Sequence, residues 1–118
     1  MTKEQLWKET LDFYKECVAK YKMPQELMIS IVQHFDNIGL NKKYFPSTSH
    51  ESLGLSTVEK YEERLVKPMV YITYQPKRKT FLLTFQRGQG KTVHEEDCGV
   101  AINKATIIRI EEWLSDAN

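Results

Sequence analysis

The sequence contains few cysteines and no long apolar run. Only two of its 118 residues are cysteine, Cys17 and Cys98, and we interpret both as free thiols because disulfides are uncommon in the cytosol. No apolar run approaches the roughly 18 residues that cross a bilayer. The charged start, residues 1–5, lacks the short apolar core of a secretory signal. These absences predict a cytoplasmic protein without a membrane span.

Net charge is also small, at +1, but the charges are unevenly distributed. Residues 64–94 contain seven basic side chains and no acidic one, whereas residues 95–118 contain six acids and two bases. An asymmetry of this kind bears on binding partners rather than on the fold. The sequence therefore predicts a basic middle and an acidic C-terminal part.

Length and composition are those of one ordinary globular domain. A chain of 118 residues with 41% hydrophobic and 28% charged residues buries roughly two-thirds of the surface that its unfolded form exposes. No internal repeat, linker or low-complexity tract interrupts it. We expect a single α+β domain spanning residues 1–118.

Two amphipathic helices are predicted at the N-terminus. Thr2 and Gln5 form a capping box, after which apolar residues recur every three or four positions as on one helix face. Pro24 ends this helix and opens a second one, which Gly39 closes. Because the link is short, we expect an antiparallel αα-hairpin.

The middle of the chain predicts a loop and then a short helix. Residues 41–55 are rich in Asn, Ser, Thr, Pro and Gly, which are typical of loops and turns. Ser56 and Glu59 have the spacing of a second capping box. A helix is therefore expected over residues 57–66, and Pro68 stops it.

The strongest local pattern predicts a β-hairpin. Residues 69–75 and 80–86 are both rich in β-formers, and residues 76–79 between them begin with a proline suited to a turn. Pairing the ends of the two runs gives one register in which six apolar side chains share a face. We expect that face to be buried against the helices; it comprises Val70, Ile72, Tyr74, Phe81, Leu83 and Phe85.

The remainder predicts one more strand and a final helix. An interrupted strand is expected within residues 91–102, and Asn103 is placed to cap a helix over residues 104–115. The fold class is α+β. It has an N-terminal αα-hairpin, a short helix, an antiparallel sheet of about three strands and a C-terminal helix, with the helices packed on one sheet face.

Motifs for catalysis or cofactor binding are incomplete. Gly90-Lys91-Thr92 lacks the glycine that a phosphate-binding loop needs five positions earlier, where Phe85 stands. Residues 94–98 offer metal-ligating types, but without the second ligand pair of a zinc site or the central glycine of a calcium loop. The Ser, Thr, His and Glu of residues 47–52 are adjacent in sequence, whereas catalytic triads are assembled from distant positions. We predict no catalytic residue, metal or cofactor.

Two charged groups are left as candidate binding sites. One is an acidic run that precedes the last predicted strand segment: Glu95, Glu96 and Asp97. The other is a set of basic residues at two turns: Lys77, Arg78 and Lys79 at the first, and Arg87 and Lys91 at the second. Because these turns lie at opposite ends of one strand, the two basic groups need not form one patch.

These features favour a non-enzymatic protein-binding domain. A small cytosolic bacterial inhibitor of the immunity or antitoxin type acts by covering a partner through complementary charge and shape, and needs no catalytic motif. The acidic run would then contact a basic toxin or enzyme. The alternative is a nucleic-acid-binding module that uses the basic turns, with affinity falling steeply with salt. An enzyme without a readable motif, which would need a deep polar pocket, is the third possibility.

Overall fold

The computed structural model describes residues 1–115, so Asp116, one of the six acids in residues 95–118, lies outside the described residues. Within this range the chain forms four α-helices, one short 3-10 helix and a five-stranded sheet, which confirms the α+β class. In chain order the elements are α1 (Lys3–Ala19), α2 (Glu26–Asn37), η1 (Leu40–Lys42), β1 (Phe45–Ser49), β2 (Ser52–Ser56), α3 (Tyr61–Arg64), β3 (Met69–Gln75), β4 (Thr80–Gln86), β5 (Thr92–Asp97) and α4 (Lys104–Leu114).

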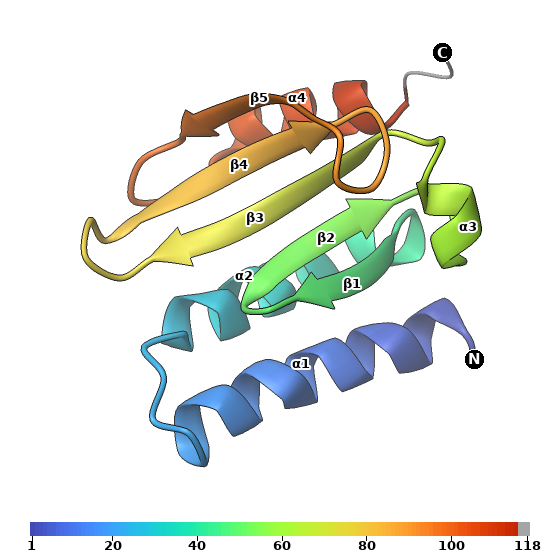
Figure 1. The fold of residues 1–118 in the computed structure, drawn as a ribbon. Coiled ribbons are helices and arrows are strands. Elements are labelled where there is room, and N and C mark those ends of the chain that lie inside the picture. Colours follow the sequence, from blue (N-terminus) through green and yellow to red (C-terminus); the bar gives the residue numbers. More distant parts are fainter. Residues whose placement is uncertain (116–118) are drawn as a thin grey trace.

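The sheet is an antiparallel meander in the order β1-β2-β3-β4-β5. Helices α2 and α4 lie behind it, while α1 runs along the β1 edge and packs against α2 (Figure 1). The opposite edge strand, β5, has no helix alongside its outer edge (Figure 1). The two sheet edges are therefore unequal: α1 flanks β1, and β5 stays accessible.

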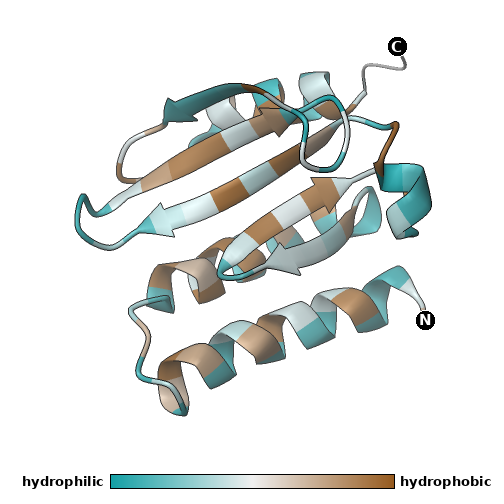
Figure 2. Cartoon of the chain, viewed as in Figure 1, coloured by the Kyte–Doolittle hydropathy of each residue, from teal (hydrophilic) through white to brown (hydrophobic). Residues whose placement is uncertain are grey.

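The predicted β-hairpin is confirmed in its register. Gln75 pairs with Thr80, and Ile72 pairs with Leu83. Five of the six side chains expected on the covered face are buried and the sixth, Tyr74, is half-buried against them. The hydropathy colouring shows the result as alternating apolar bands along β3 and β4 (Figure 2). Alternation in both strands specifies this register, since a slip by one residue would turn every apolar side chain outward.

The predicted caps at Thr2, Gly39 and Asn103 are confirmed, but the role given to Pro24 is wrong, because α1 ends at Ala19 and α2 begins only at Glu26. Thr2 Oγ1 accepts a hydrogen bond from the Gln5 backbone N–H, and Gln5 Oε1 accepts one from the Thr2 N–H. Gly39 follows α2 with a φ of 82°, a left-handed conformation that glycine adopts without strain. Asn103 Oδ1 accepts from the Thr106 N–H at the start of α4.

The expected loop over residues 41–55 is wrong, and so is the count of about three strands. The segment contains η1 and the hairpin of β1 and β2, which pairs with β3 through Leu53 and Ile72. Their composition resembles that of a loop because only Leu53 and Leu55 of β2 are large apolar side chains buried in the core. Pairing holds these polar strands in place, β2 against β3 and β1 against β2, rather than their own β-propensity.

Two other boundaries differ from the prediction. The helix expected over 57–66 is reduced to α3, without a side-chain cap, and Ser56 instead ends β2. The strand expected within 91–102 stops at Asp97, and residues 98–103 form a loop in which Val100 is exposed. In both segments the exposed apolar residues, including Tyr61 and Val66 around α3, lack a packing surface. Local patterns alone rarely sustain a helix without such packing.

The loop after β4 folds back over part of the sheet face that carries no helix. The Gln89 backbone N–H donates to the Arg64 carbonyl oxygen at 2.9 Å, and Gln89 Nε2 donates to Tyr71 Oη at 2.6 Å. Tyr71 is buried as a consequence. The rest of this open face is lined mainly by Ser and Thr side chains from the β1–β4 strands.

Candidate functional site

Strand pairing divides the predicted acidic run between two surfaces. Glu95 pairs with Thr84, Glu96 with Leu83, and Asp97 with Leu82. Because successive side chains of a strand point to opposite faces, Glu95 and Asp97 lie on the open face. Glu96 shares the helix-side face with Leu83. The three acids are adjacent in sequence but do not form one continuous patch.

The Asp97 carboxylate is already occupied by hydrogen bonds within the chain. Its carboxylate accepts hydrogen bonds from Thr80 Oγ1 at 2.6 Å, from the Gly99 N–H at 2.9 Å and from Gln75 Nε2 at 3.2 Å. The Thr80 hydrogen bond is the main cause that lowers the pKa of Asp97 below its usual range. This side chain therefore ties the end of β5 to the β3–β4 hairpin.

Glu95 is the acid most available to a partner on the open face. It is exposed, and its carboxylate accepts one hydrogen bond, from Thr84 Oγ1 at 3.2 Å. The hydrophilic colouring of β5 contrasts with the apolar bands of β4 beside it (Figure 2). Charges on an edge strand also discourage unwanted strand pairing.

Glu96 contacts two residues that line a cleft between β5 and α4, His94 and Arg109. Its carboxylate forms a close ion pair with Arg109 of α4, and His94 Nε2 lies 3.4 Å from Glu96 Oε1. The acid thus holds one cation from the helix and one imidazole from its own strand. All three groups meet because residues 94 and 96 share the face of β5 that turns toward α4.

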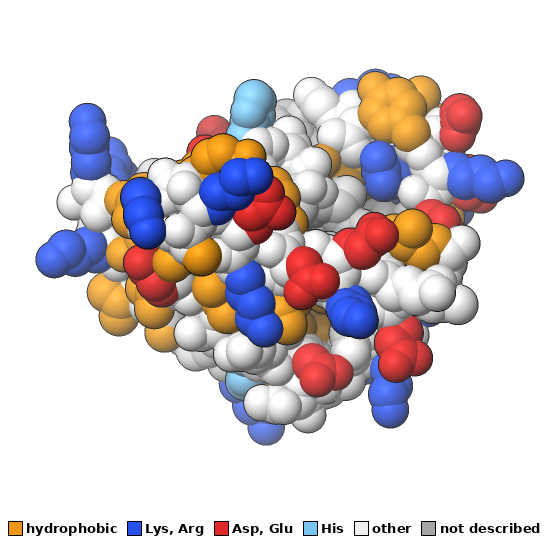
Figure 3. All heavy atoms as spheres, turned by 90° about the horizontal axis from the view of Figure 1, so that it is seen from below, with side chains coloured by type: hydrophobic (Ala, Val, Ile, Leu, Met, Phe, Trp, Pro, Cys, Tyr) orange, Lys and Arg blue, Asp and Glu red, His pale blue; other side chains and the backbone are white. Residues whose placement is uncertain are grey.

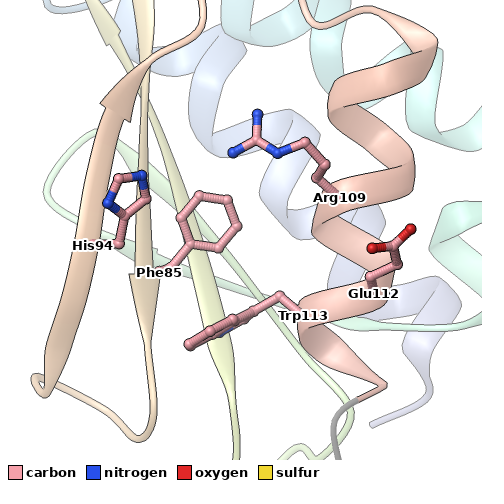
Figure 4. Close-up of a pocket in the computed structure, with 5 residues that line it drawn as sticks. All are labelled: Phe85, His94, Arg109, Glu112 and Trp113. Carbon is pink, nitrogen blue, oxygen red and sulfur yellow. The ribbon is translucent and has the colours of Figure 1, made fainter.

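The cleft has an aromatic floor and a volume of about 410 Å³. Its lining comes from three elements: Phe85 of β4, His94 of β5, and Arg109, Glu112 and Trp113 of α4 (Figure 4). The Phe85 ring centroid lies 5.6 Å from that of Trp113, edge-to-face, and 5.9 Å from that of His94. The Arg109 guanidinium lies 5.8 Å from the Phe85 centroid, while the Glu112 carboxylate points away from the ring cluster (Figure 4).

Trp113 is held rigidly in this cleft. Its indole N–H donates to two backbone carbonyls, Gln86 O at 3.0 Å and Met69 O at 3.1 Å. Arg87, one of the predicted basic residues, lies over the same ring with its guanidinium carbon 6.0 Å from the centroid. A fixed aromatic side chain loses little conformational entropy when a partner contacts it. The site therefore combines a preorganised aromatic surface with two arginines.

The predicted basic residues fall into two separate groups. Lys77, Arg78 and Lys79 are exposed at the β3–β4 turn, and within residues 1–115 no acid lies at ion-pair distance from them. Arg87 and Lys91 lie at the other end of β4, about 20 Å away for a strand of this length. The space-filling view from below likewise shows acidic and basic side chains interspersed, without a large area of one sign (Figure 3).

The sequence reasoning missed most of the cleft. Phe85 was assigned to the covered face, and neither Phe85 nor Trp113 was placed in a binding site. The missing information was the position of β5 beside α4, which brings His94 and Glu96 to Arg109. One usable signal was the spacing of His94 and Glu96, which puts them on the same face of any strand.

No family model, curated protein or solved structure matches the chain significantly. Among residues 1–115, no helix has both the length and the apolar character needed to cross a membrane. In the same part of the chain, no three His, Cys, Asp or Glu side chains are grouped so that they could hold a metal ion. The case for a function therefore depends on the surfaces described above.

Proposed function

We propose that this chain is a non-enzymatic, cytosolic protein-binding domain that blocks a partner protein, in the manner of a small bacterial immunity or antitoxin protein. Its interface would be centred on β5 and the cleft beside α4. The observation that carries the proposal is the rigid Trp113, which has Arg87 over its ring and lines one cleft together with Arg109 and Glu112. Trp and Arg are among the residue types enriched at the positions that dominate binding energy.

Charge distribution supports a protein partner with basic groups. Glu95 is exposed on the open-face side of β5, and Glu112 is exposed on the outer side of the cleft. Acids in these rim positions would attract a basic surface and speed its association, while the aromatic centre supplies contact area. The acidic run then contributes through Glu95 and, indirectly, through Glu96, which positions Arg109.

The state of the polar groups favours binding over catalysis. Arg109 and Glu96 neutralise each other in their ion pair, and the side chains of His94 and Arg109 are 59% and 46% exposed. General acid–base catalysis relies on groups whose pKa is tuned by a desolvating pocket. The cleft offers a shaped, solvent-accessible surface, as a protein interface requires.

Site-specific photocrosslinking in the source cell tests this proposal. A photoreactive residue replaces Val93, which is half-exposed on β5, and in a matched control it replaces Tyr21 at the far end of α1, which is similarly exposed. We expect one defined crosslinked protein from position 93 and not from position 21. Combining the probe with Glu95→Lys and Arg87→Glu should greatly reduce that product. Equal crosslinking from both positions, or a product insensitive to these substitutions, would place the interface elsewhere.

The alternative proposal is nucleic-acid binding by the β3–β4 turn. It is favoured by the three exposed cations there, Lys77, Arg78 and Lys79. Phosphate contacts make the logarithm of affinity fall with the logarithm of salt concentration, with a slope of about −0.9 per contact on duplex DNA. Filter binding at two salt concentrations measures that slope, and changing all three residues to alanine should flatten it by about three. Absence of retention on DNA and RNA at low salt would eliminate this alternative.

A further inference from the structure

The outward ridge of α4 carries a charge pattern that is complementary to itself. Lys104, Ile108 and Glu112 are all exposed and follow one another at intervals of four residues, so that their side chains line one side of the helix. Ile108 is 48% exposed at the centre. Along its length the ridge therefore presents a basic, an apolar and an acidic side chain, in that order.

This pattern does not stabilise α4 itself. Lys104 is the first residue of the helix and Glu112 lies in its last turn, and both charges oppose the helix dipole, which favours acids at the N-terminus and bases at the C-terminus. Within residues 1–115 neither side chain has an ion-pair partner. A contact outside the monomer would give both charges a favourable role.

A second copy of the same ridge supplies that contact. If two α4 helices pack antiparallel about a twofold axis through Ile108, each Lys104 lies opposite Glu112 of the other copy. Each charge is about 6 Å along the helix axis from Ile108, so both ion pairs form in the same register. The two helix dipoles also oppose each other in this arrangement.

Apolar surface continues beside the ridge. A groove of about 590 Å³ separates the end of α2 from α4 and is lined by Ile38, Ile102, Ile107 and Ile108, with polar groups at its rim. Two of these side chains, Ile38 and Ile108, are 45% and 48% exposed. Clustered exposed aliphatic side chains of this kind mark an interaction surface.

We propose that the α4 ridge, Lys104-Ile108-Glu112, is a self-association surface through which two copies of this chain form an antiparallel, twofold dimer. The contact is isologous, as most homodimer contacts are. One helix ridge and part of a groove bury less than the roughly 800 Å² per partner of a standard interface. The dimer is therefore expected to be weak and concentration-dependent. It does not depend on the proposed function, since it requires only the purified chain.

Sedimentation analysis of charge variants tests the proposal. The wild-type chain should form dimers within about 10 to 500 µM at low salt. Lys104→Glu places acids at both ridge positions, and Glu112→Lys places bases at both, so each variant alone should dimerise at least about tenfold more weakly, because two exposed attractions become repulsions. The double variant, Lys104→Glu with Glu112→Lys, should recover the wild-type dissociation constant. Lys15→Glu, an exposed charge reversal on α1, is the matched control and should change nothing.

Mixing the two single variants gives the sharpest result. In a heterodimer the acids of one chain oppose the bases of the other at both positions, so the mixture should dimerise more tightly than either variant alone. Circular dichroism verifies that these surface variants remain folded. A wild-type chain that stays monomeric at the highest concentration overturns the proposal. A dissociation constant that the charge reversals leave unchanged, or a mixture that fails to associate, also overturns the proposal. Lys104→Glu tests the dimer separately from the partner crosslinking at β5, because Lys104 is not among the cleft residues, whereas Glu112 belongs to both surfaces.

Discussion

Replacing Ile72 with aspartate should prevent cooperative folding at neutral pH. Ile72 is fully buried on the central strand, between Leu53 of β2 and Leu83 of β4, which are also fully buried. Losing the apolar side chain costs about 1.5 to 3 kcal/mol. Keeping the new carboxyl in this site costs a further 4 to 7 kcal/mol, roughly, at pH 7, because burial disfavours its ionised form. The sum of about 6 to 10 kcal/mol is comparable to the whole stability of a typical domain.

The pH dependence of this variant identifies the cause. Burial raises the pKa of the new carboxyl above the value of about 3.9 in the unfolded chain. Between these two values the folded state holds more protons, so the stability of the variant should rise by up to about 1.4 kcal/mol per pH unit as the pH falls toward 4. Thermal unfolding of Ile72→Asp, followed by circular dichroism from pH 7 to pH 4, measures this rise relative to the wild-type chain.

Thr73→Asp is the matched control on the adjacent position of the same strand. Thr73 is half-buried on the open face, where its hydroxyl shares a 2.6 Å hydrogen bond with the hydroxyl of Ser52. Water reaches this face, so the loss should be about 1 to 2 kcal/mol, mainly that of the hydrogen bond. If both substitutions destabilise equally, the assignment of the two sheet faces is refuted.

Two further outcomes are expected from single substitutions. Gly88→Ala adds a Cβ that would overlap the carbonyl oxygen of Leu65, so the loop after β4 must move away. Urea unfolding should show that the free energy of unfolding falls by about 1 to 3 kcal/mol, and hydrogen exchange of the Gln89 N–H should accelerate. Asp97→Asn removes a carboxylate whose pKa is lowered mainly by the Thr80 hydrogen bond. A carboxylate with a lowered pKa stabilises the fold at pH values above its pKa in the unfolded chain, and this stability is lost as the pH falls. The melting temperature of the variant should therefore decline less below about pH 4 than that of the wild type.

The elements that the sequence determined by itself are those whose signals are local. The capping residues Thr2 and Asn103 form the hydrogen bonds expected of them, because a cap satisfies backbone groups only a few positions away. The β3–β4 hairpin was predictable in register since two strands with matching alternation and a four-residue turn favour the one pairing that puts six large apolar side chains on one face.

Strands β1 and β2 were decided by tertiary structure. The segments 45–49 and 52–56 are rich in Ser and contain Pro46 and Gly54, a composition that by itself favours a loop. Gly54 is nevertheless suited to its strand, because a Cβ there would meet the Tyr71 ring and the Ser47 hydroxyl on the open face. That requirement exists only once β3 supplies the neighbouring ring.

The candidate site was also decided by tertiary structure. Side chains alternate between the two faces of an extended strand, and β5 is such a strand. Its pairing with β4 places Glu96 on the opposite face from Glu95 and Asp97, so the three acids do not form one patch. The partner of Glu96, Arg109, lies on a helix that reaches it only when α4 packs behind the sheet. Sequence patterns specify which side chains share a face of one element, while the contact between two elements depends on where both are packed.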